Sequence, residues 1–238
     1  MTRILLAGAT GAVGKTLAPM LVEAGFELFG TTRAHSKAEE LKAVGATPVV
    51  VDVYDRESLV RESVRISPDI VVHQLTDLSG HMDIARNAKM RHEGTENLVH
   101  AAVAAGARRI VAQSVAWAYA PGPEPHAETD HLDFNSTDRR RITVDGVIAL
   151  ERAVLYTPGL EGVVLRYGQL YGPGTGIVRP VGNAPLHVED AARAVVLALS
   201  AVRSGVFNIA EPNEYVSTEA ARSTLGWEAR SLQRLAPA

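Results

Sequence analysis

The feature that most constrains the fold is a series of short apolar runs that alternate with stretches of helical periodicity. None of the runs interleaves polar residues, as a strand with one face in water would do. Continuous apolar strands joined by helices must be buried on both faces, so they predict an α/β fold with a doubly wound parallel sheet. The strands are expected at Ile4–Ala7, Phe26–Thr31, Pro48–Val51, Ile70–His73, Arg109–Gln113, Val163–Arg166 and Val206–Ala210.

Helical patterns separate the expected strands, and a glycine closes several of them. They are expected at Thr16–Ala24, Ala38–Val44, Glu57–Ile66, His81–Ala105, Thr143–Leu155 and Val188–Val202. Pro19 falls in the expected first turn of the first helix, where proline is tolerated. The ligand crevice of such a sheet lies at the carboxyl ends of its strands.

Composition excludes several classes of protein and site. The formal net charge of −3 gives no basic excess for nucleic acid, and we interpret Arg139–Arg141 as a solvated loop or a helix start. The absence of cysteine excludes disulfides, thiolate metal sites and cysteine nucleophiles. The first residues lack the pattern of a signal peptide, and no apolar stretch is long enough to cross a bilayer. We therefore expect a cytoplasmic protein with no nucleic-acid or membrane partner.

Residues 7–16, AGATGAVGKT, directly follow the first strand and permit two interpretations. Ala9–Thr16 passes a relaxed form of the phosphate loop that binds nucleoside triphosphates, and Asp52 after the third strand could hold the magnesium ion. The overlapping glycines Gly8, Gly11 and Gly14 are typical of a dinucleotide turn with altered spacing.

The shortness of this turn favours the dinucleotide. Gly8 stands directly after the strand, where the first glycine of a dinucleotide site makes the tight turn. Lys15 would then lie on a helix that has already begun, with its ammonium group in solvent. We expect a Rossmann-type sheet whose first loop binds the dinucleotide through Gly8, Thr10, Gly11, Ala12, Val13 and Gly14.

The end of the second strand indicates which dinucleotide binds. A site for NAD places a carboxylate here, about 20 residues after the glycine loop, to bind the 2′-hydroxyl of the adenine ribose. This chain has Thr31, Thr32 and Arg33 at that position and no acidic residue among them. Arg33 could be an exposed loop residue, but its guanidinium can also hold a 2′-phosphate through two hydrogen bonds. We therefore expect NADP in preference to NAD.

The whole chain resembles the short-chain dehydrogenase/reductase superfamily, and most closely its extended or atypical branch of NAD-dependent epimerases and dehydratases. The motifs that carry the resemblance stand in order along the chain: Gly8–Gly14, Val51–Val53, Val71–His73, Gly94–Leu98, Ser114 with Tyr119, Leu165–Gly174 and His187–Ala192. The resemblance implies cofactor contacts at the adenine (Asp52, Val53), along the cofactor backbone (Gln74, Leu75, Thr76) and beside the nicotinamide (Gly168, Gln169).

The catalytic residues of resembling proteins are missing from this chain. Those proteins carry Tyr-x-x-x-Lys four residues before a glutamate. Counting back from Glu151, the lysine position is Val147 and the tyrosine position is Thr143. Counting back from Tyr119, the serine that polarises the carbonyl falls on Val115. Valine cannot hold a ribose or shift a pKa, and a threonine hydroxyl is a far poorer proton donor than a phenol.

One other departure and three candidates follow from the same comparison. Arg91 replaces an asparagine that is frequent in resembling proteins. The catalytic candidates that remain are Ser114, Tyr119 and Tyr167, each of which could instead serve only in packing. We favour an NAD(P)-binding oxidoreductase or epimerase-like protein that lacks the usual triad and uses NADP to reduce or oxidise a small carbonyl substrate. The alternative is a non-catalytic NADP(H)-binding sensor or partner-binding protein.

The domain organisation is expected to be simple. One NAD(P)-binding domain covers residues 1–238, segments rich in glycine, proline and acid cover the crevice at about 119–142 and 172–187, and a small substrate-binding portion follows at 203–238. His126 and His131 lie among carboxylates in the first of these segments, but a solvated loop is favoured over a metal site. We expect no metal. The resemblance also implies that a homodimer could form through the long helices.

Overall fold

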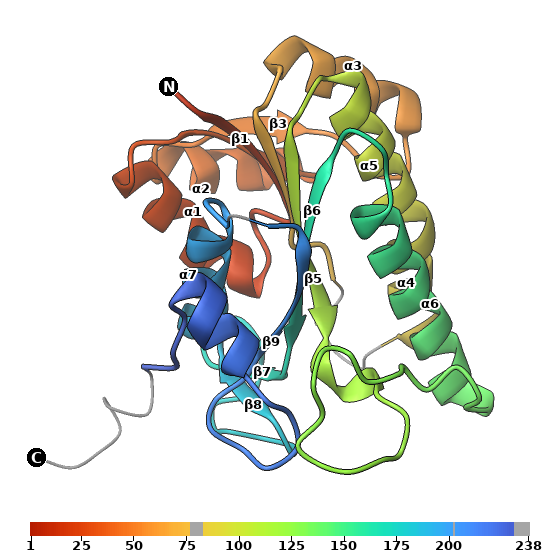
Figure 1. Cartoon of the computed structure of the whole chain (residues 1–238). Helices are drawn as coiled ribbons and strands as arrows, with labels where there is room; N and C mark the ends of the chain where they lie inside the picture. The colour runs from red at the N-terminus through yellow and green to blue at the C-terminus, as the bar shows by residue number, and fades with distance from the viewer. Residues whose placement is uncertain (77–82, 202, 231–238) are drawn as a thin grey trace, which may run out of the picture.

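The computed structural model describes residues 1–76, 83–201 and 203–230 and has a seven-stranded parallel sheet at its centre (Figure 1). The order of the strands is β3-β2-β1-β4-β5-β6-β9, and every neighbouring pair is parallel. They are β1 (Arg3–Ala7), β2 (Glu27–Thr32), β3 (Thr47–Val50), β4 (Ile70–His73), β5 (Arg109–Val115), β6 (Glu161–Tyr167) and β9 (Gly205–Ile209). A separate two-stranded parallel sheet joins β7 (Gln169–Tyr171) to β8 (Pro185–His187).

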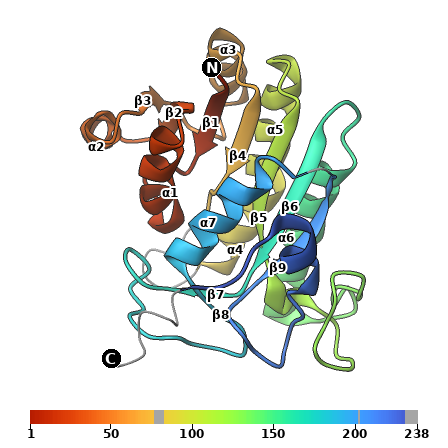
Figure 2. The same ribbon diagram turned by 60° about the vertical axis from the view of Figure 1, so that its left-hand side comes forward.

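Helices cover both faces of the central sheet, which confirms the doubly wound α/β fold (Figures 1 and 2). One face carries α1 (Ala12–Glu23), α2 (Ala38–Ala43) and α7 (Val188–Ala198). The other carries α3 (Arg56–Ile66), α4 (Ile84–Lys89), α5 (Thr95–Ala104) and α6 (Asp138–Leu155). The short helical turns are η1 (His35–Lys37), η2 (Met90–Gly94), η3 (Ala116–Ala118) and η4 (Ala221–Leu225).

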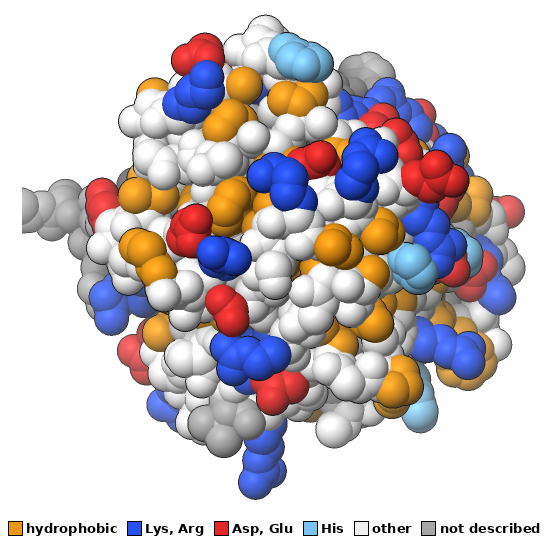
Figure 3. Space-filling view, turned by 90° about the horizontal axis from the view of Figure 1, so that it is seen from above, with side chains coloured by type: hydrophobic (Ala, Val, Ile, Leu, Met, Phe, Trp, Pro, Cys, Tyr) orange, Lys and Arg blue, Asp and Glu red, His pale blue; other side chains and the backbone are white. Residues whose placement is uncertain are grey.

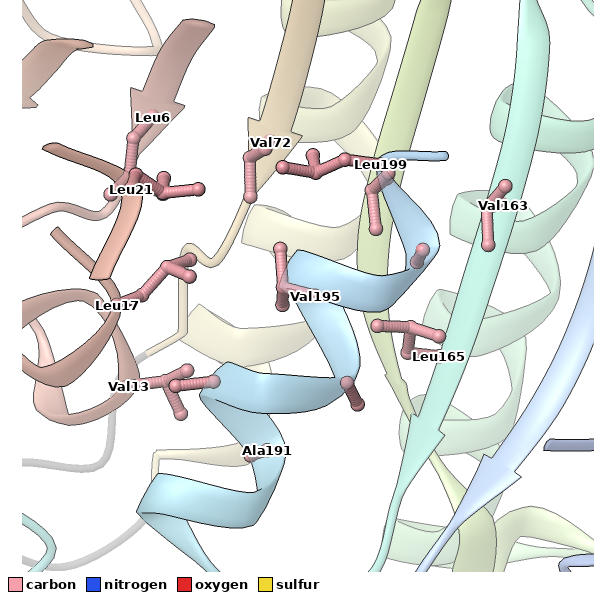
Figure 4. Close-up of a cluster of buried hydrophobic side chains, with 14 of the residues drawn as sticks. Leu6, Val13, Leu17, Leu21, Val72, Val163, Leu165, Ala191, Val195 and Leu199 are labelled. Atoms are coloured by element: carbon pink, nitrogen blue, oxygen red, sulfur yellow. The ribbon is translucent and has the colours of Figure 1, made fainter. Parts of the chain in front are cut away.

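The core follows from the alternation of side chains along the strands, because successive residues point to opposite faces of a sheet. On the first face, apolar side chains of α1 and α7 point toward one another and toward the sheet (Figure 4). The residues that meet there include Leu6, Val13, Leu17, Val72, Val163, Leu165 and Val195. On the opposite face, Leu5, Val71 and Ile110 pack with residues of α3, α5 and α6. Both faces of the sheet are therefore buried under helices, as the continuous apolar runs in the sequence predict.

The sheet has a switch point between β1 and β4. From β1 the chain crosses toward β2 and β3, and from β4 it crosses the other way toward β5 and β6. The loops that leave β1 and β4 therefore diverge at their carboxyl ends and leave a crevice between them. These two loops also touch closely, because a Cβ atom added to Gly8 would lie 2.5 Å from the carbonyl oxygen of Gln74.

Two helices begin earlier than the sequence pattern suggested. The first begins at Ala12 rather than Thr16, because Gly11 ends the turn and occupies the N-cap position. The expectation that Pro19 lies in the first turn is therefore wrong: Pro19 is inside α1. Helix α6 begins at Asp138 rather than Thr143, so Arg139–Arg141 form its first turn.

The long helix expected between β4 and β5 is divided. A π-helical turn, η2, separates α4 from α5, and residues 81 and 82 of the expected range lie outside the described residues. After α7, the strand β9 pairs with β6 and forms the edge of the central sheet. Of the expected C-terminal portion, residues 231–238 lie outside the described residues, as does Val202 of the expected helix before it.

The edge of the sheet at the amino ends of the strands is covered by charges of both signs (Figure 3). Several of these charges are paired across neighbouring strands, as in Arg3 with Glu27 and Arg109 with Glu161. Such a mixed surface gives this edge no continuous basic area for a polyanion. In the part of the chain that the structure describes, no helix has the length and apolar character needed to cross a bilayer.

Candidate functional site

A cavity of about 600 Å³ opens at the carboxyl edge of the sheet, over the switch point. It extends from the ends of β2 and β3, across the glycine turn, to the ends of β4 and β5. Most of the residues expected to bind the cofactor line this cavity: Gly8, Thr10, Gly11, Ala12, Val13, Arg33, Val53, Gln74, Leu75 and Thr76. Segments that are far apart in the sequence thus meet at one site.

The glycine turn has the shape of an anion cradle. Gly8 has a φ of +88°, a conformation that glycine adopts without strain. A Cβ atom on Gly14 would lie 2.1 Å from the carbonyl oxygen of Gly8, so only glycine allows the helix to pack this closely on the turn. No side chain caps the amino end of α1. The first N–H groups of this helix therefore remain available to a phosphate group at the cavity wall.

Lys15 lies in α1 and forms an ion pair with Glu40. The distance from Lys15 Nζ to Glu40 Oε2 is 2.8 Å, and both side chains are about half exposed. The hydrogen bond from Lys15, together with its charge, lowers the pKa of the Glu40 carboxyl. Asp52 does not line the cavity. Its carboxylate accepts a 3.0 Å hydrogen bond from the backbone N–H of Tyr54, so it shapes the turn beside the site.

Positive charge dominates the cavity wall. The cationic residues among those lining it are Lys15, Arg33, Lys37, Arg86 and Lys89, and none of the described lining residues is acidic. Arg33 is exposed at the end of β2 and has no hydrogen bond or ion pair to any residue that the structure describes. A cavity of this charge suits a ligand with several phosphate groups.

The wall beyond β3 is more apolar. Val53, Leu59, Met90 and Leu98 contribute to it from four different elements or loops. Tyr54 also lines the cavity, and Lys89 Nζ lies 4.6 Å from the centre of its ring. Apolar side chains with a few polar groups at the rim provide a surface on which a planar base can pack.

Two buried amide side chains line the cavity at the ends of β4 and β5. Gln74 is 3% exposed and Gln113 is 9% exposed. Gln74 Nε2 and Gln113 Oε1 have no hydrogen-bond partner among the described residues, although buried polar atoms nearly always have one. The glycine cradle, the uncapped helix and these unpaired atoms together fit a bound dinucleotide.

The three catalytic candidates do not line the cavity. Ser114 donates a 2.8 Å hydrogen bond to Glu151 Oε1 on α6. Tyr119 donates to Asn208 Oδ1 at 2.8 Å and accepts a hydrogen bond from Arg166. All of these side chains are buried.

The third candidate, Tyr167, is also enclosed. Its hydroxyl lies 3.3 Å from both Gln74 Oε1 and the carbonyl oxygen of Ala191. Burial raises the pKa of Tyr167. Burial also raises the pKa of Tyr119, although its interactions with Arg166 and Asn208 oppose the rise. Neither phenol is placed to exchange a proton with a ligand in the cavity.

The positions at which the sequence pattern placed the tyrosine, lysine and serine of resembling proteins are occupied by packed side chains. Val147 is fully buried and packs with Ala118 and Val144. Thr143 is also buried, and its hydroxyl lies 3.5 Å from the carbonyl oxygen of Arg139 in the preceding turn. Val115 packs against the same cluster.

Gly168 and Gln169 support a loop beside the cavity rather than line it. A Cβ atom on Gly168 would lie 2.0 Å from the carbonyl oxygen of Ala184, and Gln169 Oε1 accepts a 3.2 Å hydrogen bond from the N–H of the same residue. The loop between β7 and β8 reaches the glycine turn at Gly174, which lines the cavity near Ala12. The two residues therefore position this loop.

The residues of the cavity wall that the sequence did not assign to the cofactor include the cations Lys15, Lys37, Arg86 and Lys89 and the amide Gln113. Gln113 ends the fifth expected strand, so its position alone could have indicated it. Arg86 and Lys89 had no such signal, because helical periodicity does not show which side of α4 faces a cavity at the sheet edge.

The histidine-rich segment is built into the fold. His126 is buried, stacks on Tyr119 with ring centres 4.9 Å apart, and lies 3.1 Å from Asp130 Oδ2. It also forms a bridge to Val216. Within the described ranges, no three histidine or acidic side chains are grouped so that they could hold a metal ion.

Comparisons with known proteins agree with this geometry. Residues 4–183 match the NAD dependent epimerase/dehydratase family. The chain is also similar to the 3-diazoavenalumate denitrifying reductase of a Streptomyces species, with 40% identity over 235 aligned residues. That alignment covers 88% of this chain and 76% of the relative.

Solved structures show the same fold at low sequence identity. The UDP-glucose 4-epimerase of Thermotoga maritima has a TM-score of 0.78 and 21% identity, over 98% of this chain and 95% of its own. The Bordetella bronchiseptica enzyme WbmG, in complex with NAD and UDP, has a TM-score of 0.75 and 19% identity, over 95% and 88% of the two chains. At these identities the likeness concerns the fold alone.

Proposed function

Because this chain belongs to the NAD dependent epimerase/dehydratase family, we propose that it is an NADPH-dependent reductase that replaces a diazo group by hydrogen and releases dinitrogen. The observation that carries the proposal is the set of residues that line the cavity at the ends of β4 and β5, where the nicotinamide ring would lie. The described residues that line it there are Gln74, Leu75, Thr76 and Gln113, and none of them is an effective acid or base.

The lack of a proton donor among these described residues distinguishes between two kinds of hydride acceptor. Reduction of a carbonyl group creates an alkoxide, which a positioned acid must protonate. A diazonium group instead leaves as neutral dinitrogen, so no oxyanion develops and no acid is needed. The buried Thr143 and Val147 are compatible with the second reaction and unsuited to the first.

The reaction balances without any further reactant. When bound, NADPH supplies a hydride to the carbon that bears the diazonium group, the C–H bond forms, and the C–N bond breaks with its electron pair leaving on dinitrogen. The chain's own residues contribute binding and orientation, which can provide much of the rate when the reacting groups are held together.

The cationic rim supports the choice of NADPH over NADH. Arg33 and Lys37 line the cavity beyond the end of β2, where no described lining residue is acidic. In our proposal, they bind the 2′-phosphate of the adenine ribose, and Lys15 with its partner Glu40 forms the neighbouring edge. The N–H groups of the glycine turn bind the pyrophosphate.

The similar reductase supports the substrate class. Its name describes reduction with loss of nitrogen from a diazo compound that is a carboxylate. We extend that chemistry to this chain and propose a small diazo-bearing organic anion as substrate. The carbonyl substrate expected from the sequence becomes the comparison in the test, and a non-catalytic NADP(H) sensor is the other alternative.

The test supplies purified protein with NADPH deuterated at the transferable position and an arenediazonium carboxylate. Dinitrogen from an isotope-labelled diazo group and deuterium at the former C–N carbon are measured by mass spectrometry. The matching aldehyde carboxylate is run in parallel. Reactions without protein measure the background reduction, and the Arg33→Asp variant shows whether the rate depends on the residue proposed to bind the 2′-phosphate.

Protein-dependent release of dinitrogen with deuterium in the product would support the proposal. Reduction of the aldehyde but not of the diazonium compound would overturn the substrate class. Tight binding of NADPH without turnover of either compound would favour the sensor.

A further inference from the structure

Gln74 and Gln113 form an adjacent pair on one face of the sheet. The register of β4 and β5 pairs His73 with Ala112, so the next residues along each strand stand level with one another. Val72 and Val111, two residues earlier in each strand, both belong to the core on the α1 and α7 face. By the alternation of strand side chains, Gln74 and Gln113 continue that face beyond the core.

One end of each amide is already held by the protein. Gln113 Nε2 points to the carbonyl oxygen of Leu75 at 3.5 Å, which directs Oε1 away from that carbonyl. Gln74 Oε1 lies 3.3 Å from the hydroxyl of Tyr167. The remaining atoms, Gln74 Nε2 and Gln113 Oε1, are a donor and an acceptor without partners among the described residues.

The place of the pair in the sheet indicates which part of a dinucleotide it faces. In a doubly wound sheet, a dinucleotide lies across the switch point with its two nucleotides on opposite sides. The cationic residues Arg33 and Lys37 lie on the β2 side, where the adenine ribose is proposed to bind. Gln74 and Gln113 lie on the other side, which leaves them to the nicotinamide half.

We propose that Gln74 and Gln113 together bind the carboxamide of the nicotinamide ring and so orient it. A primary carboxamide has a carbonyl oxygen that accepts and an amino group that donates, which complements one free donor and one free acceptor. Gln74 Nε2 donates to the carboxamide oxygen, and the carboxamide N–H donates to Gln113 Oε1. This inference rests on the proposed use of a nicotinamide cofactor and adds the residues that hold its reactive ring.

Gln74 and Gln113 would replace contacts to the nicotinamide nucleotide that this chain lacks elsewhere in the site. The tyrosine and lysine positions that bind the nicotinamide nucleotide in resembling proteins are Thr143 and Val147 in this chain, and both side chains are buried. A ring without that support needs another means of orientation before a hydride can be directed at one carbon. Gln74 and Gln113 are positioning residues in this sense.

The test measures binding rather than turnover. Dissociation constants are determined by calorimetry for NADPH, for its acetylpyridine analogue, and for adenosine 2′,5′-bisphosphate. The analogue keeps the carbonyl oxygen but replaces the amino group with methyl, so it cannot donate to Gln113. The bisphosphate lacks the nicotinamide altogether and reports on folding and on the adenosine side.

Each variant has a different expected result. The wild-type protein should bind NADPH about tenfold more tightly than the analogue, because Gln113 Oε1 loses its donor. Gln113→Leu should weaken NADPH by a similar factor and remove this discrimination. Gln74→Leu should weaken both ligands equally, because both carry the carbonyl oxygen. Adenosine 2′,5′-bisphosphate should bind all three proteins alike.

Equal binding of NADPH and the analogue to the wild-type protein would overturn the inference, as would discrimination that survives Gln113→Leu. A wild-type protein that fails to bind the bisphosphate would instead contradict the proposed preference for NADPH. In that case the same comparison with NADH and its acetylpyridine analogue still decides whether the amide pair holds the ring.

Discussion

The hydroxyl of Ser114 donates a 2.8 Å hydrogen bond to the carboxylate of Glu151, so the serine at the end of β5 faces α6 and not the cavity. The same carboxylate binds Arg166 through both oxygens, at 2.9 and 2.7 Å. Arg166 also donates to the hydroxyl of Tyr119. A buried network of structural hydrogen bonds thus contains two residues that the sequence offered as catalytic candidates.

Breaking this network should destabilise the protein. We expect Glu151→Ala to lower the free energy of unfolding by about 3–5 kcal/mol, because it leaves the buried Arg166 guanidinium without a counter-charge. The double variant Glu151→Leu with Arg166→Met should recover most of the loss. Urea unfolding measures both effects. A large fall in NADPH affinity without a fall in stability would show that the network belongs to the ligand site.

Arg33 should determine the choice between the two dinucleotides. Replacement by alanine removes charge-assisted hydrogen bonds worth about 1.5–3 kcal/mol, so NADPH affinity should fall by roughly ten- to a hundredfold. NADH affinity should hardly change. Lys42→Ala is the matched control, because Lys42 is a nearby exposed cation paired with Glu39 and does not line the cavity. Equal losses for NADPH and NADH would contradict the assignment.

Gly14 should be irreplaceable even by alanine. The added Cβ atom would lie 2.1 Å from the Gly8 carbonyl oxygen, so the turn and α1 must separate. We expect a loss of about 3 kcal/mol in stability and a loss of dinucleotide binding. Gly25→Ala provides the comparison, since Gly25 has a φ of +82° but no atom near the added Cβ. It should cost only about 1 kcal/mol and leave binding intact, as titration calorimetry can show.

His73 should make stability depend on pH. Its ring is fully buried, and burial, reinforced by the charge of Arg91, lowers its pKa to about 4. The unfolded chain, with an ordinary histidine pKa of about 6.5, binds the proton first, so stability falls as the pH drops through this window. Between about pH 7 and about pH 5 the contribution to the loss is about 2 kcal/mol.

A variant isolates this contribution from the other groups that titrate. The His73→Asn variant has no imidazole that titrates. Its amide can form a hydrogen bond with the hydroxyl of Thr95, which lies 2.9 Å from His73 Nε2. Denaturant unfolding at the two pH values should show a smaller loss of stability for this variant. Equal losses in both proteins would mean that His73 is not the source. Arg91→Met should raise the pKa of His73, which can be followed by NMR.

The strands and the glycine turn could be predicted from local residues and spacing. Continuous apolar runs specify strands buried on both faces, and Gly8 directly after such a run specifies a tight turn. Thr143 and Val147 stand where resembling proteins carry tyrosine and lysine, and neither a threonine hydroxyl nor a valine side chain is an effective acid or base. The absence of an acid beside Arg33 is likewise a property of the sequence alone.

The tertiary structure decided which polar side chains meet at the cavity. Whether Ser114 points into the crevice or away from it depends on the phase of β5, since a shift of one residue moves a side chain to the opposite face. The pairing of Lys15 with Glu40 joins α1 to α2, and the level placement of Gln74 beside Gln113 depends on the register of β4 and β5. Contacts between distant segments are set by the packing of the sheet, and no local pattern in the sequence contains them.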